Sequence, residues 1–360
     1  MSSIKTTPNI RFLKLHLGMS LALVAAAACG SNDEADEFRA GVPQHEDVAL
    51  AFPGTEAASG ALTASSSDPT PTPAPTRAAL LQEKAEMYQL TRGITVTVNA
   101  ATVATLALVR TITEFPPSSV TADGAVWGPH TQALSPNTWR LTVTRESRGH
   151  FAYVLEAKDK TASDAGYLVV LSGHHVVADP TARRLLRRPA YGHGDFILDW
   201  DAAQRLPEHD SNVGKAAFVY SRPSPTAQVD IGVTFTQIRD DETGMLVDAT
   251  YAYAETPGAG GSFQFSVIKD AIATSAALET VSVRSRWLQT GAGRSDVKLT
   301  GGDLGAAQAT AQPTAQATAN ECWDASFLST YRTNSYGDAA KIWGAESACA
   351  FMPADYYDVP

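Results

Sequence analysis

Residues 138–303 alternate apolar and polar side chains in run after run, and this pattern leaves few folds open to the chain. In the first run, Trp139, Leu141 and Val143 alternate with polar residues. Because successive side chains of a β-strand point to opposite faces, each run predicts a strand with one apolar face. Glycine-rich turn signals such as residues 257–261 separate the runs. The further runs are residues 151–155, 229–235, 245–253, 263–267 and 281–287.

The runs and turns of residues 138–303 predict about nine or ten strands, and residues 118–305 as a whole are interpreted as an antiparallel meander. A flat meander leaves two unpaired edges, and curling into a barrel or half-barrel hides them. The expected fold class is therefore mainly β, with a barrel or half-barrel architecture. The face opposite the apolar one carries charged residues that are expected to face water, namely Arg140, Glu156, Asp230, Asp248, Arg284, Arg286 and Lys298.

Residues 77–117 precede the meander and predict a long helix. Strong helix formers begin at Ala78, and apolar residues then recur at intervals of three and four until Pro116 ends the pattern. A strand is the competing interpretation for residues 94–98, since they alternate and β-branched residues are poor helix formers. The helix is favoured because no turn residue interrupts the apolar pattern. A helix this apolar is expected to pack on the barrel or inside it.

The first thirty residues have the order of a secretory signal. Lys5, Arg11 and Lys14 precede an apolar run over residues 15–28, and no acidic residue occurs before Asp33. A positive start, a short apolar run and small residues at its end are typical of a leader that directs export.

Residues 24–31, Val-Ala-Ala-Ala-Ala-Cys-Gly-Ser, resemble the lipobox of bacterial lipoproteins. The resemblance implies that residues 1–28 are cut off as a signal peptide and that the Cys29 thiol carries diacylglycerol. It also implies a membrane anchor, and Gly30 after the cysteine favours the outer membrane. The alternative is an ordinary signal peptide cut at an Ala-x-Ala site, which leaves Cys29 as an incidental thiol.

Residues 29–76 are interpreted as an acidic tether. They hold eight acidic residues and one basic residue, and so supply −7 of the net charge of −10. The Pro-Thr run at residues 69–76 favours extended, solvated backbone. The acidic balance argues against nucleic acid as a partner.

Cys322 and Cys349 form an even pair in a chain expected to be exported, and such a pair predicts one disulfide. The alternative is two buried, unpaired thiols. Residues 306–320 are rich in Ala, Thr and Gln and are interpreted as a second linker. Residues 321–360 then form an aromatic tail, whose spacing predicts a short helical segment closed by the disulfide and docked on the barrel.

Three groups of side chains are candidate sites. Aromatic residues of the apolar face are the candidate lining of a ligand cavity. A cluster of arginines is a candidate anion patch for phosphate groups, with a solvated turn paired to nearby acids as the alternative. The cavity residues are Phe151, Tyr153, Phe218, Tyr251, Phe263, Phe265 and Trp287, and the anion patch is Arg183, Arg184, Arg187 and Arg188.

His174, His193 and Asp195 are weak candidates for a metal site, because imidazole and carboxylate groups bind zinc. The adjacent His174 and His175 would point to opposite faces of a strand, which favours ordinary strand-end and loop residues instead. The sequence has no Gly-x-Ser-x-Gly, His-Glu-x-x-His, Walker or dinucleotide motif. No cofactor and no enzymatic activity are expected, and residues 174–201 are where an unrecognised activity would lie.

Signal, lipidated cysteine, spacer, helix and meander follow one another in an order similar to that of open β-barrel carriers of the bacterial envelope. This layout implies a lipid-anchored carrier for an apolar ligand or lipid. A second hypothesis is an interaction or structural module whose helix fills the core and which binds no small molecule. A third, a membrane-spanning β-barrel, is disfavoured because an acyl anchor is redundant there and aromatic girdles are lacking.

Overall fold

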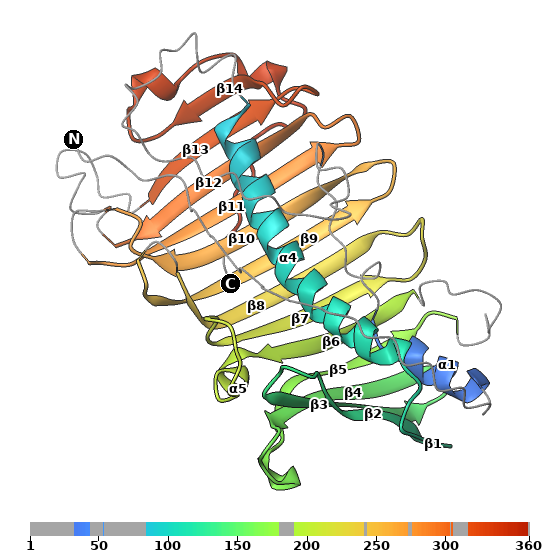
Figure 1. The fold of residues 1–360 in the computed structure, drawn as a ribbon. Coiled ribbons are helices and arrows are strands. Elements are labelled where there is room, and N and C mark those ends of the chain that lie inside the picture. The colour runs from blue at the N-terminus through green and yellow to red at the C-terminus, as the bar shows by residue number, and fades with distance from the viewer. Residues whose placement is uncertain are drawn as a thin grey trace. The chain divides into compact units, whose positions relative to one another are not determined.

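The computed structural model describes residues 32–43, 53, 84–179, 191–240, 243–272, 276–302, 304 and 316–358. This part of the chain is mainly β and contains fourteen strands in one antiparallel sheet, ordered β1 to β14 as they occur in the sequence (Figure 1). The first eight strands are β1 Ser119–Thr121, β2 Gly124–Thr131, β3 Asn137–Ser147, β4 His150–Asp159, β5 Leu168–Val177, β6 Gly192–Asp199, β7 Lys215–Arg222 and β8 Val229–Arg239. The other six are β9 Leu246–Thr256, β10 Gly260–Lys269, β11 Glu279–Leu288, β12 Gly293–Gly301, β13 Gln316–Trp323 and β14 Ser329–Asn334.

The chain divides into two compact units, which are described separately. The amino-terminal unit comprises the described residues of 11–49 and 97–246, with strands β1 to β8. The carboxy-terminal unit comprises the described residues of 50–96 and 247–360, with strands β9 to β14. Helix α4, Glu86–Glu114, contributes its first part to the carboxy-terminal unit and its second part to the amino-terminal unit.

The alternating pattern forms strands as predicted. Within residues 137–301 the structure describes ten strands, β3 to β12, so the expected nine or ten are confirmed. Their burial follows the period of two, as in β7, where Ala216, Phe218 and Tyr220 are buried and the residues between them are not. One apolar face therefore packs in the core of each unit.

Of the predicted barrel or half-barrel, the closed barrel is wrong, because the sheet is open. Within the described residues β1 pairs with β2 alone and β14 pairs with β13 alone, so the first and last strands are not joined. The β14 edge is covered instead by a two-way backbone bridge between Arg332 and Trp343. At the other edge β1 is only three residues long. Short or covered edge strands resist pairing with other chains, so closure of the sheet is not required.

Helix α4 lies within the predicted helix at 77–117, and residues 94–98 are helical rather than a strand. Ile94 and Val98 are buried, so tertiary packing outweighs the low helix propensity of β-branched residues. The predicted residues before Lys84 lie outside the described residues. No helix among the described residues is both long enough and apolar enough to span a membrane.

One helix corrects the predicted tether at 29–76. Helix α1, Asn32–Ala40, forms inside this stretch. Phe38 is fully buried and meets Phe151 of β4 edge to face at 6.1 Å between ring centroids. The acidic composition of this stretch gave no sign of the buried Phe38, which packs α1 against the core of the amino-terminal unit.

The predicted linker at 306–320 and helical tail at 321–360 also need correction. Strand β13 begins at Gln316 and β14 follows at Ser329, so both predicted segments contribute strands. Small residues in β13, such as Ala317 and Ala319, are buried although the composition suggested a linker. The remaining described helices are single turns: α5 Trp200–Ala203 and the 3-10 turns η1 Asp164–Gly166, η2 Ala339–Lys341 and η3 Glu346–Ala348.

Candidate functional site

The seven predicted cavity residues are all buried, and they belong to the cores of both units. In the amino-terminal unit Phe218 stacks on Phe196 at 4.3 Å between ring centroids. In the carboxy-terminal unit Tyr251 and Phe263 meet edge to face at 5.3 Å. These rings pack on one another as core residues do. The existence of a ligand cavity among them stays a prediction.

A histidine and a tyrosine form a hydrogen bond across an intervening strand on the buried face of the amino-terminal unit. His175 of β5, Gly194 of β6 and Tyr220 of β7 are direct neighbours in the sheet register. The His175 Nδ1 atom lies 2.7 Å from the Tyr220 hydroxyl, and both side chains are buried. Because Gly194 has no side chain, the imidazole and the phenol can meet above β6.

Glycines provide the space for this cluster. A Cβ atom on Gly194 would lie 2.1 Å from the carbonyl oxygen of His174 and 2.7 Å from the Tyr220 hydroxyl. A Cβ on Gly192 would lie 3.0 Å from Cε1 of His175. A Cβ on Gly173 of β5 would lie 2.2 Å from the Asp195 carbonyl oxygen. Sequence reasoning missed this contact because the histidines were considered as metal ligands, although Gly173, Gly192 and Gly194 beside them were a signal of close approach.

Tyr153 lies beside this cluster and stays neutral. Tyr153 of β4 donates a hydrogen bond from its hydroxyl to the Asp195 carbonyl oxygen at 3.2 Å. Burial raises the pKa of Tyr153 well above its usual value, the nearby Asp195 raises it further, and a hydrogen bond with Tyr220 opposes the rise. A phenol with a raised pKa is a hydrogen-bonding group rather than a nucleophile at neutral pH.

The metal candidates lie on the opposite, exposed face of the same strands. The His174 side chain is exposed and its Nδ1 atom lies 3.2 Å from the Asp195 Oδ1 atom. His175, the next residue, is fully buried, which confirms that the adjacent histidines point to opposite faces. His193 pairs in register with Val176 and Ser221. Within the described ranges, no three His, Cys, Asp or Glu side chains are grouped so that they could hold a metal ion.

A buried cluster of charges occupies the carboxy-terminal unit, on the sheet face opposite α4. Arg294 of β12 is 1% exposed and its Nε atom donates to Asp296 Oδ1 at 2.7 Å. Its Nη1 atom donates to Glu346 Oε1 at 2.7 Å and to the Phe351 carbonyl oxygen at 3.1 Å. Burial acts to lower the pKa of the Arg294 guanidinium, but the bonds to Asp296 and Glu346 together raise it, so the group stays charged.

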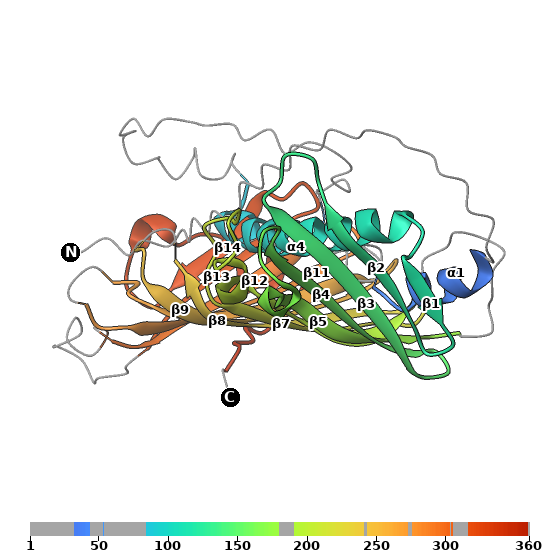
Figure 2. The same cartoon turned by 60° about the horizontal axis from the view of Figure 1, so that its bottom comes forward.

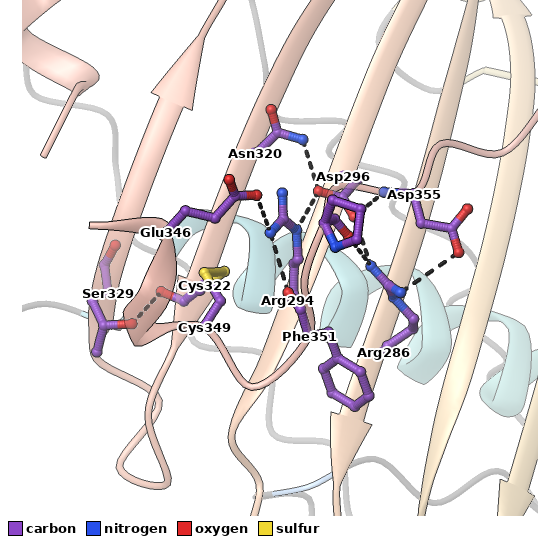
Figure 3. Close-up of a disulfide and its surroundings, with 12 residues drawn as sticks. Arg286, Arg294, Asp296, Asn320, Cys322, Ser329, Glu346, Cys349, Phe351 and Asp355 are labelled. Atoms are coloured by element: carbon purple, nitrogen blue, oxygen red, sulfur yellow. Dashed lines mark hydrogen bonds and ion pairs between the residues drawn. A yellow bond between two sulfur atoms is a disulfide. The ribbon is translucent and has the colours of Figure 1, made fainter. Parts of the chain in front are cut away.

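Asp296 is the centre of this cluster (Figure 3). Its carboxylate is fully buried and also accepts bonds from Arg286 Nη2 at 3.1 Å and Asn320 Nδ2 at 2.7 Å. The backbone N–H of Asp355 adds a fourth donor at 3.0 Å. The negative charge of Asp296 is thus balanced by two arginines and two further donors of the same chain, as a buried charge requires.

The C-terminal segment, residues 344–358, brings several of these partners over strands β11 to β13. The Cys322–Cys349 disulfide joins it to β13, with 5.5 Å between the two Cα atoms, so the predicted pairing is confirmed. The segment covers Arg286, which donates to the Pro353 carbonyl oxygen at 3.3 Å, and Lys298, which pairs with Asp358. Charged residues that were expected to face water therefore lie under the chain's own C-terminal segment.

A second polar contact fixes the start of α4 on the other face of the carboxy-terminal unit. The backbone N–H of Met87 donates to Glu321 Oε2 of β13 at 2.7 Å. Arg332 of β14 is 2% exposed, and its Nη1 atom lies 2.6 Å from Glu86 Oε2. Burial raises the pKa of Glu321, while Arg332 and the bond from Met87 oppose the rise. Sequence reasoning missed this contact because residues 316–334 were interpreted as a linker and a helix.

Two predicted sites cannot be placed. The four arginines of the candidate anion patch, Arg183, Arg184, Arg187 and Arg188, lie outside the described residues, and so does Cys29. Both remain predictions.

Comparison of the chain with protein-family models, with curated proteins and with solved structures finds no match. The fold and the clusters described above are therefore the basis for any functional conclusion.

Proposed function

We propose that the chain is an exported lipoprotein, anchored through Cys29, whose open β-sheet is an interaction or structural module with a filled core. The Cys322–Cys349 disulfide is compatible with an exported, non-cytoplasmic protein. The leader and the lipobox-like residues 24–31 support the anchor, and the outer membrane is the proposed location.

The observation that carries the filled core is the way α4 is fixed on the sheet. Glu321 accepts the Met87 N–H, and Glu86 pairs with Arg332 at 2.6 Å and with Lys341 at 3.2 Å. One helical turn further on, the Thr91 hydroxyl lies 2.6 Å from that of Ser285. A helix fixed by buried bonds of this kind is part of the core, because breaking one partner leaves a buried charge or dipole unpaired.

An interaction role is supported by the exposed face of the amino-terminal unit. Ile197 of β6 is 45% exposed and Val219 of β7 is 64% exposed, on two strands that pair directly. Ala217 is the register partner of Ile197 and is exposed as well. Exposed apolar side chains on neighbouring strands suit contact with another macromolecule.

The carrier hypothesis is the second candidate, and a different observation supports it. The Tyr251 hydroxyl of β9 and the Thr95 hydroxyl of α4 are buried, and neither makes a well-formed hydrogen bond with any described residue. Burial raises the pKa of Tyr251, and the nearby Thr95 hydroxyl lowers it in part. Polar groups of this kind beneath a helix suit the head group of an apolar ligand that enters between α4 and the sheet.

Ligand content separates the two candidates. Native mass spectrometry of the purified protein, followed by titration with a fluorescent fatty acid, is expected to show the bare chain mass and no saturable binding. Bound lipid, or binding of the fluorescent fatty acid that is lost in a Tyr251→Phe variant, would contradict the filled core and support the carrier hypothesis. A Tyr356→Phe variant is the matched control, since its hydroxyl bonds to Asn320 on the opposite face of the sheet.

Anchoring is tested by labelling cells with a palmitate analogue. We expect label on the wild-type protein and recovery of the protein with membranes. In the Cys29→Ala variant we expect no label and release from membranes without detergent, because the proposed acyl chains are the sole anchor. Label that persists in this variant would contradict the anchor.

A further inference from the structure

We propose that α1 holds the amino-terminal unit directly against the lipid bilayer, so that residues 29–76 do not act as a long free tether. The inference rests on the proposed lipidation of Cys29. It assigns a membrane-facing surface, which is the side of the amino-terminal unit around α1 and β1.

Aromatic packing and side-chain hydrogen bonds fix α1 on the amino-terminal unit. Phe38 is 0% exposed and packs on Phe151. Arg39 donates from Nε to the Thr113 carbonyl oxygen at 2.7 Å and from Nη2 to the Phe115 carbonyl oxygen at 3.2 Å, at the C-terminal end of α4. These carbonyls belong to the last turn of the helix and the residue after it, where intrahelical donors are lacking, so Arg39 also serves as a C-terminal cap.

An ion pair and a close backbone approach complete the docking. Glu37 of α1 pairs with Arg145 of β3 at 2.8 Å, and the Arg145 guanidinium lies 5.0 Å from the centre of the Phe38 ring. Arg145 also donates to the Ala122 carbonyl oxygen at 2.6 Å, beside β1. At Gly41 a Cβ atom would lie 2.5 Å from the Phe151 ring, so the chain after α1 runs tightly against the core. Figures 1 and 2 both show α1 beside β1 and the end of α4.

The distance from the lipid to this docked helix is short. Two residues, Gly30 and Ser31, separate Cys29 from Asn32, the first residue of α1. Three Cα-to-Cα steps reach at most about 11 Å. A free flexible tether of the expected length would instead allow a root-mean-square reach of about 35–40 Å. In this arrangement residues 44–83 connect α1 to α4 and do not separate the lipid from the protein.

The surface around α1 suits contact with lipid. Phe115 is 49% exposed, and its backbone carbonyl is one of the two that Arg39 binds. Val120 of β1 is 37% exposed, two residues from the Ala122 carbonyl that binds Arg145. Exposed apolar side chains at the water–lipid interface add to the affinity that acyl chains provide. Phe115 and the residues beside Val120 are linked to α1 through Arg39 and Arg145, so a bilayer held at the start of α1 can contact these apolar side chains.

The test measures the depth of a fluorophore in vesicles that carry the purified lipoprotein. Val120→Cys and Leu134→Cys variants are each labelled with an environment-sensitive fluorophore, since the disulfide and the lipid occupy the three native cysteines. Leu134 is 98% exposed and is the matched control, an apolar residue in the β2–β3 connection. It lies at the far end of β2 from Val120, about 20–25 Å along the strand. The vesicles contain phosphatidylethanolamine, phosphatidylglycerol and a nitroxide-labelled lipid as quencher.

We expect strong quenching at position 120 and weak quenching at position 134. A further variant carries a twenty-residue Gly-Ser insert between Ser31 and Asn32, which adds a reach of about 25 Å. It is expected to stay on the vesicles while quenching at position 120 falls to the level at position 134. Equal quenching at both positions in protein that floats with the vesicles would overturn the docked anchor alone. Protein that fails to float with vesicles would overturn the lipidation as well.

Discussion

At the scale of single residues, a glycine that has no side chain makes room for a hydrogen bond in the amino-terminal core. Gly194 lies between His175 and Tyr220 in the register, and the hydrogen bond between these two residues passes over it. Glycine is costly within a strand because it loses much conformational freedom on folding and packs no side chain. Its presence at this position is explained by the close approach of the imidazole and the phenol.

A Gly194→Ala substitution is expected to destabilise the protein by about 1–3 kcal/mol, the usual cost of overpacking a core. The new methyl group would collide with the His174 carbonyl oxygen, which is backbone and cannot rotate away. The control is Gly232→Ala in β8, where a Cβ meets no atom within 4 Å. Chemical denaturation of both variants checks the prediction, and an equal effect of the two substitutions would contradict it.

At the scale of elements, hydrogen bonds and ion pairs fix the positions of the helices α1 and α4. Helix α4 begins on the Glu321 carboxylate, and α1 is held by Arg39 and by the Glu37–Arg145 pair. Apolar burial supplies most of the stability of a packed helix, but it is not directional. The buried hydrogen bonds and ion pairs are directional, because each forms with good geometry in only one position of the helix. They therefore fix where the helix lies on the sheet.

The Glu321 carboxylate gives the α4 contact a pH dependence with a definite sign. Its pKa is raised in the folded chain, mainly by burial, from an ordinary value of 4.5. Between the ordinary and the raised pKa the folded state binds more protons than the unfolded state, so stability falls as pH rises through this window. The contribution is fully present below pH 4.5 and is lost above the raised pKa.

A Glu321→Gln variant lacks this titration. The free energy of unfolding of the variant relative to the wild type is therefore expected to increase as pH rises from about 4 to 7. Chemical denaturation at a series of pH values measures the difference. Glu114→Gln on the exposed end of α4 controls for the loss of one carboxylate. A flat difference at position 321, equal to that at position 114, would show that the Glu321 pKa is not raised.

At the scale of the whole molecule, the disulfide connects the fold to its compartment. Cys322 and Cys349 are 27 positions apart in sequence, and their bond joins the C-terminal segment to β13. That segment completes the bonding of Arg294 and Asp296, so its attachment stabilises a buried cluster as well as a loop.

Loss of the disulfide is expected to lower the free energy of unfolding by about 3–4 kcal/mol on the chain-entropy estimate. The variant is Cys322→Ala with Cys349→Ala, compared with the wild type in the presence and absence of a reductant. Reductant is expected to destabilise the wild type alone. Thiol labelling after denaturation is expected to find Cys322 and Cys349 free in protein made in the cytosol without its leader, and bonded in exported protein. Free thiols at these positions in exported protein would contradict the link between fold and compartment.

The sequence by itself determined the elements whose local pattern and burial agree. The alternating runs within residues 138–303 specified strands β3, β4 and β8 to β11, and the apolar spacing before Pro116 specified α4. The even pair of cysteines specified the disulfide. In each case the residues that made the local pattern, the apolar side chains or the cysteines, are the ones that are buried or bonded in the structure.

The tertiary structure decided the features that depend on partners distant in sequence. Helix α1 forms because Phe38 meets Phe151, and β13 forms in a low-complexity stretch because it pairs with β12. The open sheet has one edge covered by the bridge from Arg332 to Trp343 and the other formed by the three-residue strand β1, and no local pattern encodes this arrangement. Arg294 is buried and Arg286 is partly buried because the C-terminal segment crosses them. Local periodicity reports the face on which a side chain lies, but the surroundings of that face depend on contacts that form only when the chain folds.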